Sequence, residues 1–124
     1  MNKDKISKIV DKVYPQIVKK LGGKQAKIKL HHDIYERLGA INNEEFSENP
    51  SAEYNYGDKT IYLYYSAIGS TEEIIKSLLH EHTHSMQSRK LFKLIYECGH
   101  VYSTHPYEKQ AMKAELKWKD YENK

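Results

Sequence analysis

Three histidines and a glutamate lie close together in the segment His80-Glu81-His82-Thr83-His84, which contains the pattern His-Glu-x-x-His. On an α-helix, which turns about 100° per residue, His80 and His84 point in directions about 40° apart and lie about 6 Å apart along the axis. Both imidazoles can therefore bind one metal ion, while Glu81 points beside the ion without having to bind it. Zinc fits this chemistry, because it prefers nitrogen and oxygen ligands of these kinds.

A catalytic zinc site uses three protein ligands and one water, so the two histidines need a third ligand. One class of zinc site requires Gly and His at fixed positions after the motif, but those positions hold Gln87 and Lys90. We predict instead that Glu108, in the first turn of a later helix, is the third ligand. Glu115 shares a face of that helix with Glu108, and His105 precedes it, so both are alternatives.

The helix that carries the motif should have two distinct faces. A Ser70-x-x-Glu73 capping box predicts its start, and it should run to about Ser88. Its apolar residues fill an arc of about 140°, and His80 and His84 point away from this arc. His82 lies in the middle of the arc, so we predict that it is a hydrogen-bonded core residue and not a ligand. The apolar residues are Ile74, Ile75, Leu78, Leu79 and Met86.

The first half of the chain predicts elements that support this helix. An amphipathic pattern over 4–21 predicts a helix that ends at Gly22-Gly23, with a kink or a break at Pro15. Alternation over 26–30 predicts a strand, and a short helix or turn should follow near 33–38. The polar segment 42–50 predicts a loop.

The second half predicts one hairpin and two further helices. Tyrosines surround Gly57-Asp58, which predicts a hairpin with its turn there. A helical pattern over 91–98 ends at Gly99, and Pro106 suits the first turn of a last helix. That last helix should carry one stripe of residues, namely Ala111, Ala114, Trp118 and Tyr121. Together these elements indicate an α+β fold.

Length and composition limit the other possibilities. The chain of 124 residues allows a single domain over 1–124, and its net charge of +3 does not call for a nucleic-acid partner. No apolar run approaches the roughly 20 residues of a membrane span, so we expect no membrane partner. The single Cys98 and a start without an apolar run favour a cytoplasmic location, although non-classical release is compatible with them.

The motif segment, followed by Pro-Tyr-Glu-Lys-Gln-Ala, resembles the zincin metallopeptidases of the gluzincin type. It is particularly similar to the single-domain minigluzincins and to small phage and bacterial zincin-like domains, and the resemblance covers roughly 60–118. It implies a small zincin-like domain, in which a short mixed or antiparallel sheet with an edge strand packs on the motif helix. It also implies zinc as cofactor, bound by His80, His84 and Glu108, with Glu81 as general base.

The activity that this resemblance implies is hydrolysis of peptide bonds. Zinc polarises the scissile carbonyl and lowers the pKa of water toward about 7, and Glu81 takes up the proton. Tyr102 and His100 are candidates to donate a hydrogen bond to the oxyanion. A peptide or protein substrate would pair with the edge strand, which we expect at 60–65. Larger gluzincins have an acidic residue where this chain has Met112, so the resemblance supplies no acidic partner for His84.

Two other functions are compatible with the same residues. The first is a zincin-fold protein that binds a metal ion or a partner with little or no hydrolysis. The second is a purely structural zinc ion, which would need a fourth protein ligand such as His105. The small size of the chain leaves little material for a second wall of the cleft, so we expect a shallow, open site with weak or narrowly directed activity.

Overall fold

The computed structural model describes residues 1–38 and 50–122, and within them it has the α+β architecture that the sequence predicts. The helices are α1 (Lys3–Leu21), α2 (Ile34–Leu38), α3 (Thr71–Ser85), α4 (Arg89–Glu97) and α5 (Pro106–Glu115). The strands are β1 (Lys27–His31), β2 (Ala52–Asn55) and β3 (Thr60–Tyr64). The loop predicted over 42–50 lies outside the described residues, except for Pro50. None of the described helices is both long and apolar enough to span a bilayer.

The three strands form a mixed sheet in the order β1-β3-β2. Strand β3 is parallel to β1, with Lys27 opposite Thr60, and antiparallel to β2, with Ala52 opposite Leu63. The prediction of an edge strand at 60–65 is therefore wrong, because β3 is central and all its residues are buried. The edge strand beside the motif helix is β2. A hairpin pattern shows that two strands pair, but it does not show which of them has a second partner.

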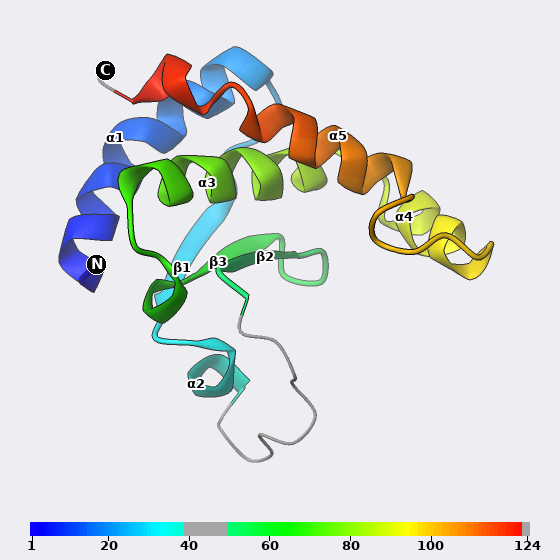
Figure 1. Cartoon of the computed structure of the whole chain (residues 1–124), viewed down its shortest axis with the longest axis horizontal. Coiled ribbons are helices and arrows are strands. Elements are labelled where there is room, and N and C mark those ends of the chain that lie inside the picture. Colours follow the sequence, from blue (N-terminus) through cyan, green and yellow to red (C-terminus); the bar gives the residue numbers. More distant parts are fainter. Residues whose placement is uncertain (39–49, 123–124) are drawn as a thin grey trace.

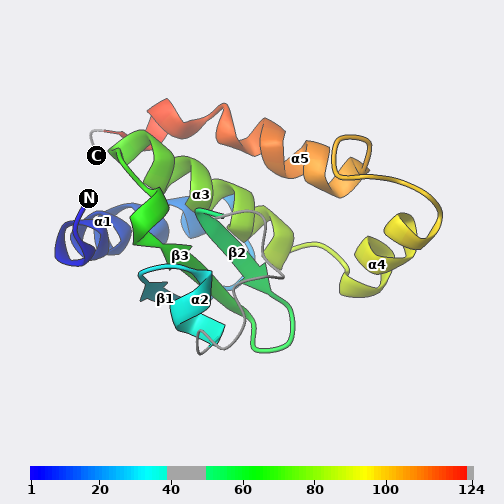
Figure 2. The ribbon, with the colours of Figure 1, turned by 60° about the horizontal axis from the view of Figure 1, so that its bottom comes forward.

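Helix α3 runs between the sheet on one side and α5 on the other (Figures 1 and 2). The apolar arc of α3 packs against α1 and the sheet, which makes the main core and leaves the opposite face of α3 turned toward α5. The fully buried apolar side chains of this core are Tyr14, Ile6, Ile17, Ile61, Leu63, Ile68, Ile74, Ile75, Leu78 and Leu79.

Helix α1 continues through Pro15 as one element, so the alternative of two shorter helices is not found. Proline removes one backbone N–H and leaves the carbonyl of Asp11 without its helical partner. Both residues lie on the exposed face of α1, where water can satisfy that carbonyl. The predicted end of the helix is confirmed, since Gly22 and Gly23 have φ angles of 86° and 79°, which favour glycine.

His82 is the buried core residue that the sequence predicts. Its side chain is fully buried, and its Nε2 donates to the carbonyl of Gly22 at 2.8 Å. Its Nδ1 then accepts from the hydroxyl of Tyr14 at 2.8 Å, and that hydroxyl accepts from the backbone N–H of Ala26 at 2.9 Å. Burial lowers the pKa of His82 and favours the neutral ring that this pattern needs. The network fixes α1 and the entry to β1 on the back of α3.

The last helix is shorter than predicted. Helix α5 ends at Glu115, and Trp118 and Tyr121 lie in a separate 3₁₀ turn. The amides of Leu116 and Lys117 bond carbonyls three residues earlier, which is the tighter 3₁₀ pattern. This turn still places Tyr121 in the core, with 3% of its surface exposed.

Candidate metal centre

Two histidines reach the site from the face of α3 that is turned away from the core. Ser70 caps the start of α3 by accepting from the amide of Glu73 at 3.2 Å, as the capping box predicts. The Nε2 atoms of His80 and His84 lie 3.1 Å apart, and both side chains are about nine-tenths buried. A helix holds this pair in register because the residues are four apart.

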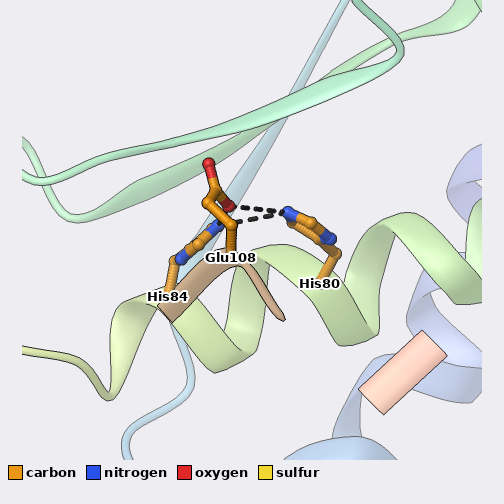
Figure 3. Close-up of side chains that lie close together, drawn as sticks. All are labelled: His80, His84 and Glu108. Carbon is orange, nitrogen blue, oxygen red and sulfur yellow. Dashed lines mark hydrogen bonds and ion pairs between the residues drawn. The ribbon is translucent and has the colours of Figure 1, made fainter. Parts of the chain in front are cut away.

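The third residue of the centre comes from the first turn of α5. Glu108 Oε1 lies 2.6 Å from Nε2 of His84 and 3.3 Å from Nε2 of His80 (Figure 3). Ala111 is fully buried, and its small side chain lets α5 approach α3 closely. The ligand atoms of the three residues lie within 4.8 Å of one another. His80, His84 and Glu108 thus form a group that could hold a metal ion.

Hydrogen bonds on the far side of each imidazole determine which nitrogen carries a proton. Nδ1 of His80 lies 2.8 Å from Oε2 of Glu115, and Nδ1 of His84 lies 2.7 Å from Oε1 of Gln87. The amide nitrogen of Gln87 donates to the carbonyl of Tyr107 at 3.0 Å, so its oxygen must face His84. Each Nδ1 therefore donates, and each neutral ring turns the lone pair of Nε2 toward the centre.

The centre consequently brings together three atoms that carry lone pairs, namely Nε2 of His80, Nε2 of His84 and Oε1 of Glu108. Oε1 of Glu108 is buried and has no hydrogen-bond partner among the described residues, although His84 Nε2 is only 2.6 Å away. Three lone pairs this close repel one another unless a cation lies between them. Two nitrogens and one carboxylate oxygen are a donor set that suits zinc and several other divalent transition metals.

The same residues retain a proton when no metal ion is bound. Burial alone would lower the pKa of His80, but the neighbouring carboxylates of Glu108 and Glu115 raise it to about 10. Burial would raise the pKa of Glu108, yet contacts with His80 and His84 lower it to about 2. The centre thus favours a positive charge between its side chains, and a metal ion would replace that proton.

Comparison with known protein families, with curated proteins and with solved structures finds no match.

Neither alternative to Glu108 lies where it would bind the ion. His105 is fully buried as the N-cap of α5, where Nε2 donates to the carbonyl of Phe92 at 2.9 Å and Nδ1 accepts from the amide of Tyr107 at 3.0 Å. Both of its ring nitrogens are engaged, which gives no support to a four-ligand structural site. Glu115 contacts the outer nitrogen of His80, so it would orient that ring and not bind the ion itself.

The hydrogen-bond partners of the two histidines were not assigned from the sequence. Met112 is 37% exposed and lies outside these contacts, while Gln87 and Glu115 hold the rings instead. One signal was available, since Glu115 lies seven residues after Glu108 and hence on the same face of α5. Gln87 lies beyond the end of α3, where helical periodicity no longer predicts direction.

Glu81 lies beside the centre, as the helical geometry predicts. Its side chain is almost completely buried at 8% exposure, and the backbone N–H of Tyr54 on β2 donates to its carboxylate. Burial raises the pKa of Glu81, and the neighbouring His80 and His84 oppose that shift. A carboxylate with a raised pKa takes up a proton more readily than an exposed one.

An open cleft of about 740 Å³ exposes the centre between β2 and α3, with α4 at one end. Tyr102 lines this cleft, and burial followed by the charge of Glu108 raises its pKa to about 12. His100 is exposed and is not a lining residue, and its ring contacts Thr104 at 3.3 Å. Tyr56 also lines the cleft, with a buried hydroxyl that has no partner among the described residues, and sequence reasoning did not single it out.

Proposed function

We propose that this protein is a zinc-dependent metallopeptidase of the gluzincin type. The observation that carries the proposal is the convergence of Nε2 of His80, Nε2 of His84 and Oε1 of Glu108, with Glu81 next to them on an accessible cleft. Three protein ligands leave a coordination position for water or substrate, which is how catalytic zinc sites differ from structural ones.

The proposed reaction divides the work between the metal and the chain. When bound, zinc supplies a Lewis acid that polarises the scissile carbonyl and lowers the pKa of a water molecule. Glu81 accepts a proton from the attacking water on its carboxylate, and the water oxygen forms a bond with the carbonyl carbon. As the carbon–nitrogen bond breaks, Glu81 returns that proton to the leaving amine. The raised pKa of Glu81 supports both transfers.

Tyr102 is the proposed donor to the oxygen anion that develops on the substrate. It lines the cleft, and its raised pKa keeps the hydroxyl protonated near neutral pH. His100 is left out of this role because its ring lies away from the cleft.

We further propose that the substrate extends along β2, and not along 60–65. The amide of Tyr64 bonds the carbonyl of Ser51 at 2.9 Å, so this pair shares ladder hydrogen bonds. In an antiparallel ladder such pairs alternate, which directs the backbone groups of Ala52 away from β3 toward the outer edge. An extended peptide can pair with these groups beside Glu81.

The decisive test compares wild-type protein with Glu81→Gln. Both proteins should hold about one zinc ion per chain by metal analysis, while only the wild type should cleave a mixed peptide pool followed by mass spectrometry. Cleavage by the variant would remove Glu81 from the role of base. Zinc binding without any cleavage by the wild type would instead favour the non-hydrolytic metal-binding function.

A further inference from the structure

Helix α4 forms one end of the cleft. Its residue Phe92 packs against His84, with ring centroids 5.3 Å apart, and against Tyr56 at 5.8 Å. The carbonyl of Phe92 also accepts from His105 at 2.9 Å. Helix α4 therefore lies beyond the end of α3, next to the metal centre, although none of its own residues is buried (Figures 1 and 2).

Two cationic side chains on α4 line the cleft. Arg89 and Lys93 are four residues apart, so they share a face of the helix, and both are exposed lining residues. Within the described part of the chain, neither of them forms an ion pair with a carboxylate. Their positive charges are therefore available to a bound molecule.

The charged side chains at the opposite end of the cleft already have polar partners. Lys76 pairs with Glu72 at 2.8 Å, and Glu53 pairs with Arg37. The carboxylate of Glu73 accepts from the amide of Gly69 at 2.9 Å. Among the described residues that line the cleft, Arg89 and Lys93 are therefore the cations without a carboxylate partner, and both lie at the α4 end.

The metal centre itself offers no such attraction for an acidic group. Its three carboxylates, from Glu81, Glu108 and Glu115, outnumber the two charges of a zinc ion. An acidic side chain of a bound peptide is consequently favoured against α4 and disfavoured next to the cleaved bond.

We propose that the cleft selects peptides that carry an aspartate or glutamate on the α4 side of the cleaved bond, bound by Arg89 and Lys93. This inference rests on the proposed peptidase function, because it names the substrate class of the same site. Pairs between exposed charges are individually weak, so the expected selectivity from two cations is roughly three- to tenfold. It should shrink as salt is added, since exposed charges are screened.

The test measures binding separately from cleavage. The zinc-loaded Glu81→Gln variant is mixed with a random octapeptide library at low ionic strength, and the retained peptides are sequenced by mass spectrometry. Retained peptides should be enriched in aspartate and glutamate by roughly three- to tenfold. Adding R89Q and K93Q should abolish the enrichment. The matched control adds K90Q and K109Q, which remove the same charge from exposed positions that do not line the cleft, and should preserve it.

The wild-type protein is then given the same peptide library, and the cleavage products are sequenced. In the cleaved peptides, the aspartate or glutamate should lie consistently on the same side of the broken bond and should not be adjacent to it. Equal recovery of acidic and neutral peptides would overturn the inference, as would enrichment that survives R89Q and K93Q. If the acidic selectivity is found but the wild type cleaves nothing, the substrate-binding inference stands and only the peptidase proposal fails.

Discussion

Replacing Glu115 with glutamine tests whether this residue orients a metal ligand. The carboxylate lies 2.8 Å from Nδ1 of His80 and 29% of the side chain is exposed. Glutamine has the same shape and can still accept a hydrogen bond, but it removes the negative charge. The variant therefore changes one electrostatic contact of the centre and leaves its three ligands in place.

The expected loss of zinc affinity follows from the contact that is weakened. Substitution of a group that hydrogen-bonds a metal-binding histidine usually lowers metal affinity by about 10- to 100-fold. Because Glu115 is partly exposed and glutamine keeps a neutral hydrogen bond, we expect the lower end, about tenfold, or about 1.4 kcal/mol. Glu108→Gln removes a ligand itself and should weaken binding considerably more.

The loss should also depend on pH, with a definite sign. In the metal-free protein Glu115 helps to raise the pKa of His80 to about 10, so a proton competes with zinc below that pH. The variant lowers this pKa and weakens the competition. The affinity ratio of wild type to variant should therefore be larger at pH 9 than at pH 6.5.

Competition with a chromophoric chelator measures both affinities, and Glu72→Gln is the matched control. Glu72 lies on α3 and pairs with Lys76 at 2.8 Å, so this control removes the same charge without touching the centre. Equal zinc affinities for Glu115→Gln and Glu72→Gln would refute the proposed role of Glu115. A ratio of wild-type to variant zinc affinity that falls as the pH rises would refute the proposed competition between a proton and zinc.

Three further outcomes can be measured. Tyr14→Phe should lower the free energy of unfolding by about 1–3 kcal/mol in urea titrations, because it leaves buried groups of His82 and Ala26 without a partner; an unchanged midpoint would contradict this. Ala111→Leu should lower it by about 1–3 kcal/mol and also weaken zinc binding, since the larger side chain separates α5 from α3; loss of stability with intact zinc affinity would show that the centre tolerates the separation. In metal-free protein, protonated His80 stabilises the fold below pH 6.5, and this contribution is lost as the pH rises toward about 10. Zinc-loaded protein should instead gain stability over that range, because protons compete less with zinc. Melting temperatures that change with pH in the same way in both forms would contradict the assignment of this proton to His80.

Features that depend on one helix could be predicted from the sequence. The period of 3.6 residues is enough to separate the face that carries His80 and His84 from the face that buries His82, and the structure agrees with both directions. Glu108 required one more step, because a proline start and small residues indicate which later helix approaches α3.

Features that depend on distant pairing could not be predicted in the same way. The position of β3 in the middle of the sheet comes from its parallel pairing with β1, in which Lys27 lies opposite Thr60, far along the chain. Gln87 and Tyr56 lie after a helix end and in a hairpin, where side-chain direction depends on local turns. Of the two alternatives that the sequence offers at Pro15, a kink or two shorter helices, the second is wrong, because exposure of that position lets α1 continue.

The small number of contacts between α4 and the rest of the chain affects how the sequence of this protein can evolve. The helix contributes no buried residue, and it contacts the rest of the chain through the aromatic side chains of Phe92 and Tyr96. Exposed positions usually accept replacement with little effect on folding. If the proposed peptidase function holds, mutations at 89 and 93 would therefore alter which peptides are bound while His80, His84 and Glu108 stay in place, so the chain could acquire new targets without first acquiring extra stability.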